Sequence, residues 1–186
     1  MVRLSIYNGD VLVPAKCGSR FLDTIWENKT DTSTFYLFEI IDNIKTIIVR
    51  NPYEHLSSAL HTDLLHIWNR EWVSVDESVI LKNYTQIDNG SHYQLNLYET
   101  LYEFWDKNNR TAQIVKLDDL TDFIKDVGIP YNFDENDYNW KPIFDIWKTK
   151  EEIMDYVKET YPEIYNFLME HIQREIEFYN KMINNE

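Results

Sequence analysis

A turn near the N-terminus brings a lysine, a glycine and a hydroxyl side chain together, just before a helical pattern. The segment runs from Val11 to Trp26, and its turn holds Lys16, Gly18, Ser19 and Arg20. The start of a helix presents free backbone N–H groups and the positive end of the helix dipole, which together attract phosphate. Gly18 would let the backbone approach the anion closely, and Lys16 would follow charge on a leaving group. The segment therefore predicts an anion site, although its lysine precedes the glycine, unlike the nucleotide P-loop.

A second segment, Thr46 to His61, has the same order of apolar run, turn and helix. Arg50 directly follows the apolar run, and Ser58 lies eight residues further on. Ligands of parallel sheets gather at the carboxyl ends of the strands, and an arginine fork holds phosphate through two hydrogen bonds. Two such turns in one small domain predict a ligand with two separate phosphate groups.

The elements that must position these turns alternate between strands and helices. We expect strands at 2–7, 10–14, 34–40, 45–49 and 112–117, with the pair Asn8-Gly9 as a tight turn. We expect helices at 19–26, 52–68, 91–107, 118–127 and 149–182, the last interrupted near Pro162. Residues 29–33 read as a polar loop, and 70–90 as loop with a strand or two. The pattern predicts one α/β domain over residues 1–186, with a central parallel sheet flanked by helices.

Composition excludes several classes of protein. The 186 residues are 44% hydrophobic, too many for a disordered chain, and no apolar run approaches the about 20 residues that span a membrane. A formal net charge of −14 argues against nucleic-acid binding. Cys17 is the sole cysteine, so neither an intrachain disulfide nor a cysteine zinc cluster is expected, and no other metal-ligand spacing stands out. A soluble protein of the cytoplasm fits best, with no membrane or nucleic-acid partner.

The two segments together resemble the donor-binding motifs of sulfotransferases that use PAPS, 3′-phosphoadenosine 5′-phosphosulfate. That family has a loop similar to P-K-x-G-T-T, and the loop here is PAKCGSR, with Ala15 inserted and Arg20 in place of the second threonine. Its 3′-phosphate motif is similar to R-[DN]-P-x-x-R-x-x-S-x-Y. Here it is RNPYEHLSSAL, in which His55 replaces the second arginine and Leu60 the aromatic residue. Downstream, IVKLDDL and the C-terminal EEIMDYVKETYPEIYNFL also resemble segments of small bacterial, viral or carbohydrate-type members.

The resemblance implies a P-loop-like sulfotransferase fold and a set of donor-binding residues. The 5′-phosphosulfate would be bound by the first turn, which comprises Lys16, Cys17, Gly18, Ser19 and Arg20. The 3′-phosphate would be bound by Arg50 and Ser58. Cys17 reads as a small filler rather than a nucleophile, because no partner base is evident.

The implied reaction is transfer of a sulfuryl group from PAPS, as cosubstrate, to a hydroxyl or amine of a small-molecule or saccharide acceptor, without a metal. Lys16 would stabilise the charge that develops on the leaving phosphate. A general base is expected, either His92 or Glu39, with His92 favoured. An aromatic loop around Tyr138, Trp140 and Lys141 could cover the adenine or the 3′-phosphate.

Two other functions fit parts of the pattern. One is a nucleotide or small-molecule kinase with an atypical P-loop, disfavoured by the missing GK[ST] motif. The other is a non-catalytic descendant that keeps the fold to bind a nucleotide or a partner.

Overall fold

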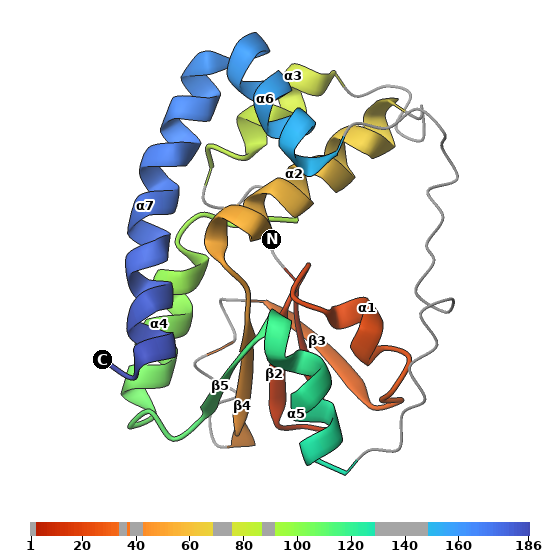
Figure 1. The fold of residues 1–186 in the computed structure, drawn as a ribbon, viewed down its shortest axis with the longest axis vertical. Helices are drawn as coiled ribbons and strands as arrows, with labels where there is room; N and C mark the ends of the chain where they lie inside the picture. The colour runs from red at the N-terminus through yellow and green to blue at the C-terminus, as the bar shows by residue number, and fades with distance from the viewer. Residues whose placement is uncertain (1–2, 34–36, 38–42, 69–75, 87–91, 129–148) are drawn as a thin grey trace.

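The fold is seen in a computed structural model that describes residues 3–33, 37, 43–68, 76–86, 92–128 and 149–186. Its centre is a five-stranded sheet in the order β3-β1-β2-β4-β5. The strands are β1 (Arg3–Tyr7), β2 (Val11–Pro14), β3 (Lys29–Ser33), β4 (Thr46–Val49) and β5 (Gln113–Lys116). The carboxyl ends of β2 and β4 lie at the same edge of the sheet, below α2 in Figure 1.

The sheet is mixed, so the expected central parallel sheet is wrong in part. β2, β4 and β5 are parallel to one another, whereas β1 runs antiparallel to both β2 and β3. The cause is the tight turn between β1 and β2, in which Asn8 and Gly9 adopt φ of 49° and 79°. Positive φ at both residues forms a tight turn, closed by the Asp10 N–H, which donates to the Tyr7 carbonyl at 3.1 Å. Asn8, Gly9 and Asp10 thus connect Tyr7 directly to its partner Val11, and such a hairpin pairs its strands antiparallel. The α/β class is confirmed, but the topology is mixed.

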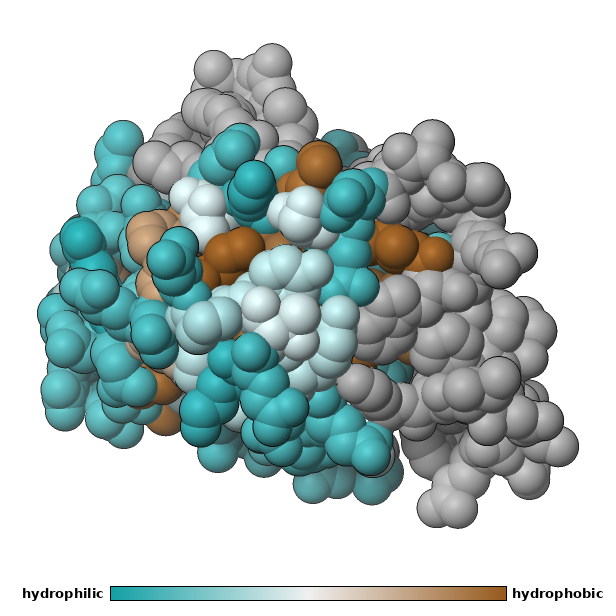
Figure 2. All heavy atoms as spheres, turned by 90° about the horizontal axis from the view of Figure 1, so that it is seen from above, coloured by the Kyte–Doolittle hydropathy of each residue, from teal (hydrophilic) through white to brown (hydrophobic). Residues whose placement is uncertain are grey.

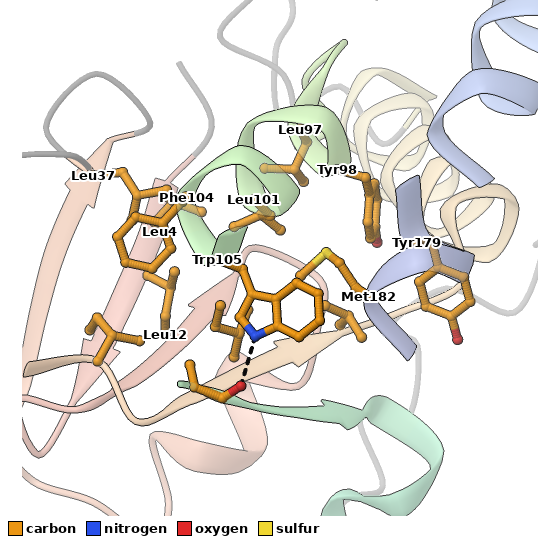
Figure 3. Close-up of a cluster of buried hydrophobic side chains, with 14 of the residues drawn as sticks. Leu4, Leu12, Leu37, Leu97, Tyr98, Leu101, Phe104, Trp105, Tyr179 and Met182 are labelled. Carbon is orange, nitrogen blue, oxygen red and sulfur yellow. Dashed lines mark hydrogen bonds between the residues drawn. The ribbon is translucent and has the colours of Figure 1, made fainter. Parts of the chain in front are cut away.

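Helices cover both faces of the sheet because its central strands β2 and β4 are buried on both sides. In β4, Ile47 and Val49 face α4 (Leu97–Lys107) and α7 (Pro162–Asn184), while Ile48 faces α1 (Ser19–Leu22) and α5 (Leu120–Asp126). Figure 3 shows the first of these clusters, in which the Trp105 indole N–H donates a buried hydrogen bond to the Ala112 carbonyl at 2.8 Å. The strand ends are therefore held between two packed layers.

A third apolar cluster lies beyond the sheet and is built by helices. It packs α2 (Pro52–Trp68), α3 (Glu77–Asn83) and α6 (Lys150–Thr160) against the N-terminal half of α7. Thr149 and Glu152 form a reciprocal capping box that starts α6. Pro162 is the first residue of α7, which confirms the predicted interruption of the C-terminal helix.

Several predicted boundaries and elements differ from the structure. Residues 29–33, predicted as loop, form edge strand β3, and the region predicted to hold a strand before residue 90 contains α3. Helix α1 ends at Leu22 instead of Trp26, and α4 begins at Leu97 instead of 91. A short 3₁₀ turn, η3 (Leu117–Asp119), precedes α5. Apart from Leu37, which is buried, the predicted strand 34–40 lies outside the described residues.

The surface mixes hydrophilic side chains with small apolar areas, as the described part of the face in Figure 2 shows. In the described part of the chain, no helix is both long and apolar enough to cross a membrane.

Candidate functional site

The first predicted turn connects β2 to α1 and is shaped by two positive-φ residues. Lys16 has φ of 63° and Gly18 has φ of 90°. A Cβ added at Gly18 would lie 2.8 Å from Leu120 and 2.9 Å from Leu117. From the sequence, Gly18 was expected to let a ligand approach the backbone; the structure shows that packing of the turn against η3 and α5 also requires a glycine here. Ser19 follows as the first residue of α1, and the Arg20 side chain lies outside the described part.

Arg50 joins the two predicted turns. It is the first residue after β4, and its side chain is only 12% exposed. Its Nη1 donates to the Lys16 carbonyl at 3.2 Å, and its Nε lies 3.5 Å from Oε2 of Glu54. That Nε is buried and makes no hydrogen bond within the described residues. The ends of two adjacent parallel strands thus bring the first turn and Arg50 together.

Helix α2 contributes a second link to the same turn. The Lys16 ammonium donates to Oγ1 of Thr62 at 2.9 Å, and that hydroxyl donates to the Ser58 carbonyl at 3.0 Å. Ser58 is half-buried, one helical turn before Thr62. Lys16, Arg50 and Ser58, predicted from two separate motifs, therefore lie around one region of the structure.

His55 occupies the interior of this region. Its ring is fully buried, and Nδ1 lies 3.1 Å from the Tyr98 hydroxyl and 3.9 Å from the Cys17 sulfur. Burial, and then the charge of Arg50, lower the pKa of His55 to about 3, against a smaller opposite effect of main-chain groups of His92 and Ala15. The imidazole is therefore neutral, and it packs behind the turns rather than carrying charge to a ligand.

Cys17 packs into the core below the first turn. Its side chain is fully buried, and its backbone N–H donates to the Pro14 carbonyl at 3.1 Å. Burial raises the pKa of the thiol to about 12. His55 is the neighbouring base that the sequence did not reveal, but a neutral histidine beside a protonated thiol does not make a nucleophile. In this structure the side chain and the N–H of Cys17 are therefore both engaged within the protein.

His92 is oriented by a buried carboxylate. Its Nδ1 hydrogen-bonds to Oδ1 of Asp63, and its backbone N–H donates to Oδ2 of Asp63 at 3.3 Å. The Tyr84 hydroxyl donates to the same Oδ2 at 2.5 Å. Burial by itself would raise the pKa of Asp63, but the hydrogen bonds from His92 and Tyr84 lower it. The His92 side chain remains 38% exposed, so it can meet a solute while Asp63 fixes its orientation.

Lys150, at the first position of α6, is a cation that the sequence analysis missed. Its pKa is lowered by burial and then by the charge of Arg50, and raised by Glu54 and Glu151. Two positive charges near each other attract an anion more strongly than either charge alone. The sequence analysis placed a cation near this point at Lys141, which lies outside the described residues with Tyr138 and Trp140, as does Glu39.

Asp63 and Glu175 were also missed, although the sequence holds a signal for both. Asp63 interrupts the apolar stripe of α2 between Leu60 and Leu64, and Glu175 interrupts that of α7 between Ile172 and Tyr179. Both carboxylates are buried. A charged residue at a core position of a helix must find partners, so it marks a polar network.

In comparisons with known proteins, no protein-family model, curated protein or solved structure matches the chain. Among the described residues, no cluster of three or more histidine, cysteine or carboxylate side chains is arranged to hold a metal ion.

Proposed function

We propose that the protein is a small PAPS-dependent sulfotransferase that sulfates a hydroxyl or amine of a small-molecule or saccharide acceptor. The observation that carries the proposal is the hydrogen bond from the Arg50 guanidinium to the Lys16 carbonyl at 3.2 Å. It brings together two turns that the sequence assigned to two phosphates of one ligand. The α/β fold supports the proposal at a coarser level, because both turns follow the carboxyl ends of the parallel strands β2 and β4, where ligands of such sheets tend to bind.

Donor binding divides between the two turns. Lys16 and Ser19 would hold the 5′-phosphosulfate, with the backbone of the first turn, and Arg50 with Ser58 would hold the 3′-phosphate. Lys150, whose pKa is lowered in part by the charge of Arg50, adds positive charge to the same region. The Lys16 ammonium, which donates to Thr62 in this structure, would turn to the bridging oxygen as charge develops there.

The chemical step is an in-line displacement at sulfur. The acceptor oxygen forms a bond to sulfur while the bond from sulfur to the 5′-phosphate oxygen breaks, giving a sulfate ester and 3′,5′-bisphosphoadenosine. Nε2 of His92 takes the proton of the acceptor hydroxyl. Asp63 keeps the hydrogen of His92 on Nδ1, because an ionised carboxylate can only accept, and so leaves Nε2 as the base.

Calorimetric titration with 3′,5′-bisphosphoadenosine, and separately with ATP and Mg²⁺, tests the proposal. We expect the bisphosphate to bind and Arg50→Ala to weaken it about 100-fold, because a charge-assisted phosphate contact is lost. Lys45→Ala is the matched control: this lysine is 79% exposed and pairs with Asp10 at the opposite end of β4. It should bind as the wild type does.

Two results would contradict the proposal. Binding of ATP with Mg²⁺ and not of the bisphosphate would favour the kinase alternative. Tight bisphosphate binding without sulfate transfer to any member of a panel of sugars, phenols and amines would favour a non-catalytic binding protein.

A further inference from the structure

Tyr98 connects the helical layer behind the sheet to the main chain of Arg50. It is fully buried in the first turn of α4, and its labelled ring lies in the core shown in Figure 3. Its backbone N–H donates to Oε2 of Glu175 on α7 at 2.8 Å. Its hydroxyl donates to the Arg50 carbonyl at 2.5 Å. One residue therefore ties α7, α4 and the end of β4 together.

The same hydroxyl orients His55. Because the phenol hydrogen goes to the Arg50 carbonyl, the phenol oxygen is an acceptor for the Nδ1 hydrogen of His55, 3.1 Å away. The two rings also meet edge-on, with centroids 6.0 Å apart. His55 in turn contacts Cys17, in the middle of the first turn, through that nitrogen at 3.9 Å. The contacts of Tyr98 thus reach both turns of the candidate site from behind.

Glu175 anchors Tyr98 from the far side. Asn96, the N-cap residue before α4, adopts a left-handed conformation and makes no side-chain cap. The Glu175 carboxylate, fully buried, replaces that cap by accepting the Tyr98 N–H. The backbone of Tyr98 is consequently fixed by a second helix before its hydroxyl reaches Arg50.

We propose that Tyr98 is a positioning residue for the anion site: its hydroxyl holds the Arg50 main chain and the His55 ring in the arrangement that presents Arg50 and the first turn to the ligand. The proposal rests on the proposed function, because it takes the site to bind 3′,5′-bisphosphoadenosine. Binding groups held in place before the ligand arrives lose less freedom on binding, so removing the hydroxyl weakens affinity without touching the ligand.

The first test compares Tyr98→Phe with Tyr93→Phe. Tyr93 is also buried, and its ring lies edge-on to His55 with centroids 5.2 Å apart, so the control removes a phenol hydroxyl beside the same imidazole. Both substitutions keep the ring and its packing. We expect Tyr98→Phe to weaken bisphosphate binding about tenfold, as for one lost buried hydrogen bond, and Tyr93→Phe to change it less than about twofold.

The second test needs no nucleotide and uses the only cysteine of the chain. Cys17 is buried in the first turn, so the rate at which 5,5′-dithiobis(2-nitrobenzoate) labels it reports how often the turn opens. We expect Tyr98→Phe to speed labelling at least about tenfold beyond the rise in unfolded fraction measured by urea denaturation. If Tyr98 affected only global stability, the labelling rate would rise in proportion to the unfolded fraction and no further.

The two readouts separate failure of this inference from failure of the proposed function. If the wild type does not bind the bisphosphate, the proposed function fails, and labelling alone decides whether Tyr98 holds the turns. If Tyr98→Phe binds as tightly as the wild type, or is labelled no faster than its unfolding predicts, Tyr98 does not position the site.

Discussion

Asp63 accepts hydrogen bonds from both the ring and the main chain of His92, although 29 residues separate the two in sequence. The carboxylate side chain is 3% exposed, whereas the histidine side chain is 38% exposed. A buried carboxylate that accepts a hydrogen bond from one nitrogen of an exposed imidazole fixes both the orientation and the tautomer of the imidazole. A histidine that acts as a base requires this arrangement. The sequence predicted the histidine but not its carboxylate partner.

Replacing His92 should therefore slow catalysis without weakening donor binding. His92→Ala removes the proposed base, and we expect kcat for sulfation to fall about 10²- to 10⁴-fold. Asp63→Asn, which no longer enforces the Nδ1 tautomer, should lower kcat in the same direction. The measurement is steady-state sulfation together with the Kd of 3′,5′-bisphosphoadenosine, which should stay unchanged. His66→Ala, a histidine three residues after Asp63 on the same helix, serves as the control. Equal kcat values for wild type and His92→Ala would leave His92 without a catalytic role.

Gly18 should tolerate alanine far less well than Gly128, although both have positive φ. Gly18→Ala combines the strain of positive φ with a Cβ at 2.8 Å from Leu120, and we expect a loss of about 2–4 kcal/mol of unfolding free energy. Gly128→Ala has φ of 75° but no atom within 4 Å of the added Cβ, so it should lose only about 1 kcal/mol. Urea denaturation of both variants measures the difference. Equal losses would mean that Leu117 and Leu120 move aside without penalty.

Glu175 should make the protein less stable as pH rises from about 4.5 to about 7. Burial raises the pKa of this carboxyl from 4.5 to about 7 in the folded protein. Between those values the folded state keeps a proton that the unfolded state has lost, so raising the pH favours unfolding. The total effect is about 3 kcal/mol, complete above about pH 7. Glu99 opposes ionisation, whereas the Tyr98 and Glu99 main chains and the charge of Arg174 favour it.

The variant Glu175→Gln isolates this effect, because its amide oxygen can still accept the Tyr98 N–H. Urea denaturation from pH 5 to pH 8 should show the variant gaining stability over the wild type as pH rises. Glu177→Gln, on the same helix but exposed, should follow the wild type at every pH. A constant difference between Glu175→Gln and wild type would place the Glu175 pKa near that of an exposed glutamate.

Lys150 should contribute to anion binding through its charge. Lys150→Ala removes the cation beside Arg50, and we expect bisphosphate affinity to fall about 3- to 10-fold at low salt and less at high salt. Lys158→Ala, an exposed lysine later in α6, should have no effect. Calorimetry at two salt concentrations measures both variants. If Lys150→Ala and Lys158→Ala lose the same affinity for the bisphosphate, Lys150 acts only through the overall charge of the helix.

The parts of the fold predicted from the sequence are those with strong local signals. Apolar runs bounded by turns located β1, β2, β4 and β5, and Pro52 and Pro162 marked the starts of α2 and α7. Strand direction was wrong where two local signals disagreed: the alternation of strands and helices favoured a parallel sheet, but the Asn8-Gly9 turn requires an antiparallel pair. β3 was missed because its residues are polar, and edge strands do not need apolar side chains.

The candidate site was predictable only as far as its residues lie within a motif. Lys16, Arg50 and Ser58 follow from their neighbours along the chain. Asp63 and Tyr98 do not, because their roles depend on contacts with residues at least 21 positions away. Such contacts arise when helices pack, and the sequence signals them only through a polar residue on an apolar helix face.

The polar composition of β3 has a consequence for how the molecule behaves beside copies of itself. β3 is an outer strand of the sheet, and no described strand pairs with its other side. Lys29 and Asp31 along it form an ion pair at 3.6 Å, with side chains 31% and 53% exposed. A second molecule could extend the sheet here only by displacing water from these charges. The polar residues that made β3 hard to recognise in the sequence therefore also disfavour pairing of this strand with a second molecule.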